Sequence, residues 1–154
     1  MTINVTSPIT GTAQTGLTSP TYTLTADTAP AANIKQWAVT ALGGTQTGVS
    51  AHSASAPFVL RAQRPLVYKG LSPVGSNGIL RSVPRNTLKM GILKSTIPLV
   101  GQAPVIAQIW LTWDVPAGAT ETDANSLMAM ASCLFGWIAN QSAGIGDAAR
   151  TGIL

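Results

Sequence analysis

Charged side chains are scarce in this chain. Only 9% of its 154 residues are Asp, Glu, Lys or Arg, against about 25% in a typical soluble domain. A lone monomer with so few charges would be poorly soluble. Either much of the neutral surface lies against other copies of the chain, or its many threonines and serines solvate it. Of these two explanations we favour the first.

The chain also lacks the residues that several classes of protein require. The single cysteine, Cys133, excludes an intrachain disulfide scaffold and a multi-thiol zinc site. No apolar run reaches the roughly 18 residues of a membrane span. The single histidine, His52, stands among alanines and serines, and Gly144-Ile145-Gly146 is no phosphate loop. We therefore expect no catalytic residue, metal, cofactor, small-molecule substrate or membrane partner.

The basic residues that are present cluster in the middle of the chain. Eight Lys or Arg residues and no acids occur from Lys35 to Lys94, and all five acidic residues lie outside that stretch. A net charge of +4 distributed in this way favours a polyanionic partner. The simpler alternative is that scattered cations only keep a sheet soluble.

Alternating apolar and polar residues predict three strands, over 58–63, 85–97 and 105–115. Ser76-Asn77-Gly78 adds a hairpin signal. The topology that follows is an antiparallel meander with one covered face and one open, basic face.

The open face is the candidate RNA-binding site, because Arg and Lys neutralise phosphates and polar side chains reach sugars and bases. Trp110 either stacks on an unpaired base or fills part of a core or interface. The residues expected to share this face are Arg61, Gln63, Arg85, Thr87, Lys89, Gln108, Trp110 and Thr112.

The last part of the sequence predicts helices. Thr120-Glu121-Thr122-Asp123 fits a capping box, an apolar stripe follows to Ala139, and a break at Ser142–Gly144 precedes a short helix around Asp147–Thr151. No charge occurs between Asp123 and Asp147, so the back of the first helix is not built to face water. We therefore predict a dimer core formed by Leu127, Met130, Leu134, Trp137 and Ile138.

Together these segments resemble the coat proteins of single-stranded RNA bacteriophages, the leviviruses. The strand Ile109–Val115 before Pro116, the helical stretch 125–140 and the small-residue ending 144–154 carry the resemblance best. Ile34–Trp37 resembles the family's tryptophan-bearing segment, and Asn86–Met90 resembles its central RNA-facing strand.

The resemblance implies one α+β domain over residues 1–154. Its parts would be an N-terminal β-hairpin (1–27), a five-stranded antiparallel sheet (34–116) and two C-terminal helices (120–154) that interlock with a second subunit. Residues 66–84 look like an insertion relative to shorter members. The turn at 98–104 is short for the loop that, in the family, meets neighbours at the symmetry axes.

The resemblance also implies a function. The chain would be a virion coat protein that dimerises, assembles into an icosahedral shell in the bacterial cytoplasm, and binds a genomic RNA hairpin on its inner sheet face. Thr87 and Lys89 match RNA-contacting positions of the family, as do Arg61 and Gln63. The remaining predicted contacts, Gln108, Trp110 and Thr112, occupy positions at which the family often has Tyr, Asn and an acidic residue. The alternative is a cellular, basic, dimeric nucleic-acid-binding module that forms no shell.

Overall fold

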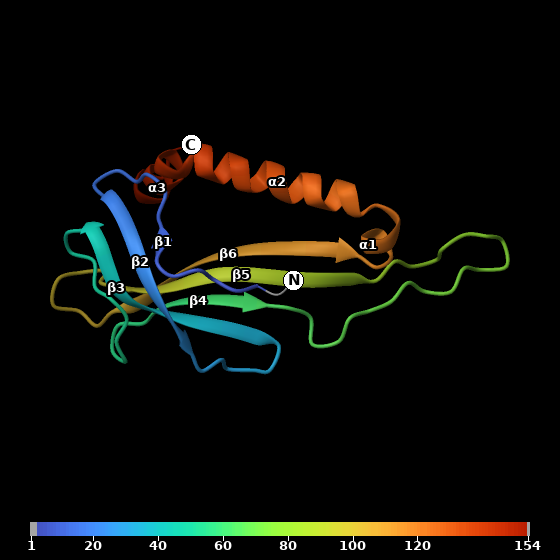
Figure 1. The fold of residues 1–154 in the computed structure, drawn as a ribbon, viewed down its shortest axis with the longest axis horizontal. Helices are drawn as coiled ribbons and strands as arrows, with labels where there is room; N and C mark the ends of the chain where they lie inside the picture. The colour runs from blue at the N-terminus through green and yellow to red at the C-terminus, as the bar shows by residue number, and fades with distance from the viewer. Residues whose placement is uncertain (1–2, 154) are drawn as a thin grey trace.

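The computed structural model describes residues 3–153. Residues 1–2 of the predicted hairpin and residue 154 of the predicted helical segment lie outside the described residues. The strands form one antiparallel sheet, and the C-terminal helices lie over one of its faces (Figure 1). The strands are adjacent in chain order: β1 (Ile9–Thr10), β2 (Thr18–Asp27), β3 (Ile34–Thr45), β4 (Phe58–Gln63), β5 (Arg85–Thr96) and β6 (Val105–Pro116).

The α+β fold class is confirmed, but the strand count differs from the prediction. Segment 34–116 holds four strands rather than five. The hairpin β1–β2 is part of the same sheet, because β2 also pairs with β3, and the sheet therefore has six strands. Ser76–Gly78 does form a turn, closed by a 3.1 Å hydrogen bond from Gly75 N to Ile79 O, but it lies in a long loop without flanking strands. Pro73 and Pro84 cannot donate to a ladder, which disfavours strands there.

The register of the strands defines two faces, because residues directly opposite each other in antiparallel strands point to the same side. One row runs across four strands through Gln36, Arg61, Gly91 and Trp110. We call this side the polar face.

The adjacent row carries large apolar side chains and defines the apolar face. It runs through Trp37, Leu60, Ile92 and Ile109. The predicted alternation of the three strands over 58–115 agrees with this arrangement, residue by residue.

Three helices follow β6: α1 (Ala119–Thr122), α2 (Ala124–Asn140) and α3 (Ser142–Thr151). The predicted capping box is wrong. The chain leaves β6 through Gly118, whose positive φ of 82° suits glycine, and makes the single turn of α1. Asp123 then precedes α2 without a side-chain capping bond, so Thr120–Asp123 is a separate turn rather than the start of the long helix.

The predicted break at Ser142–Gly144 is also wrong, because α3 runs through these residues and the two helices meet at Gln141. One of the two glycines inside α3, Gly146, lies at a contact with the β1–β2 loop. A Cβ atom at residue 146 would collide with the Gln14 side chain of the β1–β2 loop. None of the helices described within residues 3–153 has the length and apolarity to cross a bilayer.

Candidate functional site

All of the predicted RNA-contacting residues lie on the polar face. A second row joins Gln63, Lys89 and Thr112, next to the row of Arg61 and Trp110. Arg85, Thr87 and Gln108 occupy positions of the same parity on β5 and β6. The structure therefore brings together on one surface the residues that the sequence analysis grouped from three strands.

Arg61 is held by a relay of hydrogen bonds across the polar face. Its Nε donates to Gln36 Oε1 at 2.6 Å, and Gln36 Nε2 donates to Asp27 Oδ2 at 2.6 Å. These contacts fix the guanidinium through one nitrogen. Its terminal nitrogens have no hydrogen bond within the described residues and are free to meet a phosphate.

Asp27 anchors this relay. The side-chain hydrogen bond from Gln36, then the backbone N–H of Thr28, holds the pKa of the Asp27 carboxyl below its ordinary value. Both bonds favour the charged form. The relay therefore carries a carboxylate at neutral pH.

Trp110 belongs to the polar face and not to the core beneath the helices. Its indole ring lies over Gly91 on β5, where any side chain would collide with it. Its Nε1 donates to Gln108 Oε1 at 3.0 Å, and 38% of the residue remains exposed. The ring is thus held with an accessible surface, as base stacking requires.

The polar face is not free of acidic residues, contrary to the expectation from the charge distribution along the chain. Asp27 on β2 and Asp114 on β6 both lie on it. Asp114 accepts a short hydrogen bond from the Thr87 hydroxyl. Thr87, which the sequence predicts as an RNA contact, is therefore already hydrogen-bonded to a carboxylate of the same face.

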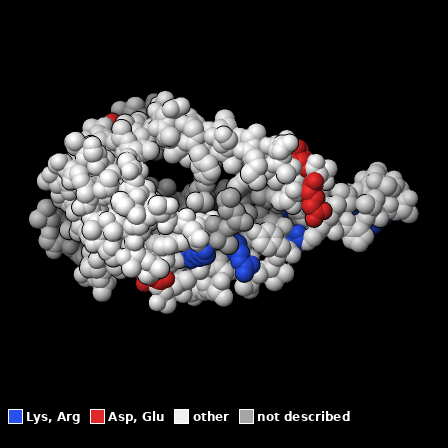
Figure 2. Space-filling model, in the orientation of Figure 1, with Lys and Arg blue, Asp and Glu red and all other residues white. Residues whose placement is uncertain are grey.

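The central basic stretch also divides among several surfaces. Arg61, Arg85 and Lys89 lie on the polar face, but Lys35 and Lys94 occupy positions of the other parity. The remaining bases of that stretch, Arg64, Lys69 and Arg81, lie in the β4–β5 loop. Figure 2 shows how widely charged atoms are spaced over the surface seen there.

A second candidate surface lies between α2 and the apolar face. A cavity of about 280 Å³ is bounded by β6 and by Met130, Leu134 and Phe135 of α2. A neighbouring cavity of about 270 Å³ reaches across β3–β6 and is bounded by Phe135 and Ile138. Figure 2 shows an opening beneath the helical layer. The helix therefore spans its own sheet without closing on it.

All residues of α2 are described, and each is at least partly exposed. Of the predicted dimer residues, Leu127 and Leu134 are half-buried, whereas Met130, Trp137 and Ile138 are exposed. Trp137 has 64% of its surface exposed. The premise that this chain does not cover its own apolar helix is confirmed.

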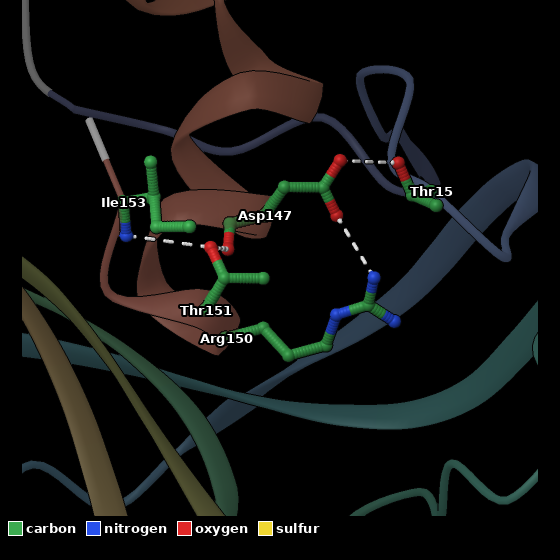
Figure 3. Close-up of polar contacts among 5 residues, drawn as sticks. All are labelled: Thr15, Asp147, Arg150, Thr151 and Ile153. Carbon is green, nitrogen blue, oxygen red and sulfur yellow. Dashed lines mark hydrogen bonds and ion pairs between the residues drawn. The ribbon is translucent and has the colours of Figure 1, made fainter.

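Polar contacts hold α3 to the β1–β2 loop (Figure 3). Asp147 accepts a hydrogen bond from Thr15 Oγ1 at 2.8 Å and pairs with Arg150 at 3.5 Å. Ser142, which is buried, donates to Ala13 O at 2.8 Å, and its carbonyl accepts from Gln14 Nε2 at 2.7 Å. With α1 attached to β6 at the other end, α2 is fastened at both ends.

The residues considered for catalysis have structural surroundings. His52 Nδ1 accepts a hydrogen bond from the Phe58 backbone at 3.1 Å, which ties the loop before β4. Cys133 is exposed on α2. Among residues 3–153, no group of three or more His, Cys, Asp or Glu side chains is placed to hold a metal.

Four residues of the polar face were missed by the sequence analysis: Asp27, Gln36, Gly91 and Asp114. Asp114 continues the alternation of Thr112 along β6, which would have found it, whereas Asp27 and Gln36 join this face only through the register of their strands. Gly91 carries no such signal, because its role is to leave room for the Trp110 ring of the neighbouring strand.

Comparison with known proteins identifies the family. No protein-family model and no curated protein sequence matches the chain. Among solved structures, a chain from the virus-like particle of bacteriophage ESE020 matches with a TM-score of 0.97 and 48% identity, over 99% of this chain and 100% of that one. A chain from the virus-like particle of Beihai levi-like virus 32 matches with a TM-score of 0.46 and 20% identity, over 86% and 88% of the two chains. With nearly half of its residues identical to those of the first over its whole length, the chain belongs to the levivirus-like coat-protein family of bacteriophages.

Proposed function

We propose that this protein is a capsid protein that dimerises, assembles into an icosahedral shell and binds single-stranded genomic RNA on its polar face, including a packaging hairpin. Membership of a family with a virus-like particle among its solved structures supports the shell. The observation that carries the dimer is the exposure of α2 above an unfilled apolar space.

The energetics of α2 favour a second chain as its cover. Burying one large apolar side chain contributes about 1.5–3 kcal/mol, and α2 exposes Met128, Met130, Phe135 and Trp137. Apolar space is available to receive them, because a cavity of about 150 Å³ already holds a benzene ring and each cavity under α2 is larger. A partner helix at this position would bury the exposed side chains of α2 and also fill the apolar space beneath it.

Trp113 supports the same conclusion. Its side chain lines the cavity between β6 and α2, and its indole Nε1 is buried without a hydrogen-bond acceptor within the described residues. An unsatisfied buried donor costs about 1–3 kcal/mol. An oxygen from a second chain in this cavity would remove that cost.

The edge of the sheet offers a second dimer contact. β6 is the last strand in the sheet order and extends over Val105–Pro116. A long edge strand exposes unpaired backbone groups and pairs readily with another chain. Antiparallel pairing with a second β6 would continue the sheet through a two-fold axis and would join the polar faces of both subunits.

The RNA-binding part of the proposal rests on the polar face. Arg61, Arg85 and Lys89 supply charge for phosphates, and Thr87, Gln63 and Thr112 supply hydrogen-bonding groups. Trp110 offers the exposed flank of a fixed ring for an unpaired base. In the assembled shell this face would point inward and the helices outward.

The proposed role is structural and not enzymatic, in keeping with the structural contact of His52. The alternative, a cellular nucleic-acid-binding module without a shell, is disfavoured by the family of the chain. Electron microscopy of the purified protein tests the proposal directly. We expect uniform closed particles whose ultraviolet absorbance spectrum is dominated by nucleic acid. After disassembly and nuclease treatment, the spectrum should be that of protein alone. A soluble monomer at micromolar concentration would contradict both dimer and shell.

A further inference from the structure

The loop between β4 and β5, residues 64–84, projects beyond the end of the sheet (Figure 1). We divide it into a root (64–71) and a tip (72–83). The tip exposes Val74, Ile79 and Val83, and Ile79 has 62% of its surface in solvent. Clustered apolar side chains on a surface mark a site of interaction.

The root of this loop is fastened to the sheet. The buried Asn86 side chain accepts a hydrogen bond from Lys69 N at 2.8 Å and donates to Lys69 O at 2.9 Å. The Leu71 side chain lies against Gly118, where a Cβ atom would come within 3.3 Å of Leu71 Cδ2. The direction in which the loop leaves the sheet is therefore set by β5 and by the β6–α1 junction.

The tip has an ordered turn but no cover. Within residues 3–153 its hydrogen bonds are internal: Gly75 N to Ile79 O at 3.1 Å, Gly78 N to Gly75 O at 2.9 Å and Ile79 N to Asn77 Oδ1 at 3.2 Å. The chain from the ESE020 particle superposes with a TM-score of 0.97. A loop this long in a different place would hold the score well below that value, so the subunit of that particle projects its loop in the same way.

The charges of the tip indicate which surface it would bind. Arg81 is the charged residue of the tip, and the loop as a whole carries bases and no acid. Glu121 and Asp123 are exposed at the α1–α2 junction, at the end of the molecule from which the loop projects (Figures 1 and 2). One end of the protein thus offers an apolar, basic tip beside the apolar root of the loop and the acidic α1–α2 junction.

We propose that the tip docks on a second copy of this chain, in a neighbouring dimer, against the root of that copy's loop and its α1–α2 junction. Val74, Ile79 and Val83 are the apolar anchors, and Arg81 faces Glu121 and Asp123 of the neighbour. Because tip and root lie at the same end of the molecule, two copies can make this contact reciprocally about a two-fold axis. The inference rests on the proposed shell, for which it supplies a contact between dimers.

The experiment measures the protein concentration at which particles form, by light scattering and electron microscopy. Val74→Ser with Ile79→Ser should leave the circular dichroism and the dimer unchanged but raise that concentration about tenfold, equivalent to about 1.4 kcal/mol. Arg81→Glu should have a similar effect, and adding Glu121→Arg to it should restore assembly. Ile79→Leu and Arg81→Lys are the matched controls, and they should assemble like the wild type.

The outcomes separate this inference from the function on which it rests. If the wild type forms no particles, the proposed function fails. If it does, and both the serine variant and Arg81→Glu assemble at the wild-type concentration, only the docking inference fails. If the serine variant unfolds, the test rests on the charge variants. Failure of Glu121→Arg to restore the assembly of Arg81→Glu then overturns the inference. Reduced RNA content in intact Arg81→Glu shells would assign the tip to RNA and overturn it as well.

Discussion

The indole ring of Trp110 lies over Gly91, its register partner on the neighbouring strand, so that these two residues form one unit of the polar face. The absence of a side chain at residue 91 permits the ring to lie against the sheet. The bond from Trp110 Nε1 to Gln108 then fixes its orientation.

Replacing Gly91 by alanine should therefore displace Trp110. Overpacking of this kind costs about 1–3 kcal/mol, and the displaced ring should also lower RNA affinity. Thermal unfolding and RNA titration measure the two effects. Gly70→Ala is the matched control, because a Cβ atom there meets open space. If the ring is the cause, adding Trp110→Ala to Gly91→Ala should recover the lost stability; an additive double mutant would contradict this.

Lys89→Ala should weaken RNA binding while shells still form. Loss of one phosphate contact with a single strand reduces the slope of log K against log salt by about 0.7. A salt titration of purified dimers with RNA provides the measurement. Lys35→Ala removes the same charge from a position of the opposite parity and should leave the slope unchanged. Equal slopes for the wild type and the Lys89 variant would remove Lys89 from the site.

Gln36→Leu should release Arg61, because it removes both bonds of the relay while keeping a side chain of similar size. An exposed, charge-assisted hydrogen bond contributes about 1 kcal/mol or less once solvent screening is counted, so we expect a loss of RNA affinity of a few-fold. Arg61→Lys in the same assay provides the comparison. A double mutant with additive losses would show that Gln36 acts independently of Arg61.

The anchoring by Asp27 should be lost in acid. Its pKa in the folded protein is lowered from 3.8, so its contribution to stability is complete above that value and disappears as the pH falls through the lower, folded pKa. Asp27→Asn keeps the hydrogen-bond acceptor but does not titrate. The two proteins should therefore differ in stability at neutral pH, and this difference should shrink as the pH falls below 3.8. Parallel profiles throughout would contradict the assignment.

Trp137→Ala tests the dimer. With 64% of its surface exposed in a single chain, this residue adds little to the stability of the isolated subunit, but full burial by a partner makes its truncation cost about 3–5 kcal/mol. Analytical ultracentrifugation should show a shift from dimer to monomer. Ile153→Ala, an exposed apolar residue beyond α2, should not shift it. A Trp137→Ala dimer as tight as the wild type would mean that this side of α2 faces solvent.

The sequence was informative where local periodicity decides the structure. Alternation placed Arg61, Lys89 and Trp110 on one face, because strand residues alternate regardless of which strands are neighbours. It failed where pairing between distant segments decides. Asp27 joins the polar face only because β2 pairs with β3, and its distance from the basic stretch along the chain hid this contact.

The helical region shows the same limit. Serine and glycine predict a break near residue 144, yet both glycines lie in a helix whose start is hydrogen-bonded to the distant β1–β2 loop. The exposure of α2 could be anticipated from its missing charges. The hydrogen bonds by which Asn86 holds the β4–β5 loop could not be anticipated, because nothing in the local sequence marks that asparagine as buried.

The fastening of α2 at both ends constrains the order in which two subunits can come together. If a second copy fills the space beneath α2, its side chains must enter before the hydrogen bond from Ser142 to Ala13 forms. Folding and dimerisation would then be one concerted event, and dissociation of the subunits would first require that hydrogen bond to break. A particle built from such interlocked dimers would owe its persistence to slow dissociation of the subunits as much as to the strength of any single contact.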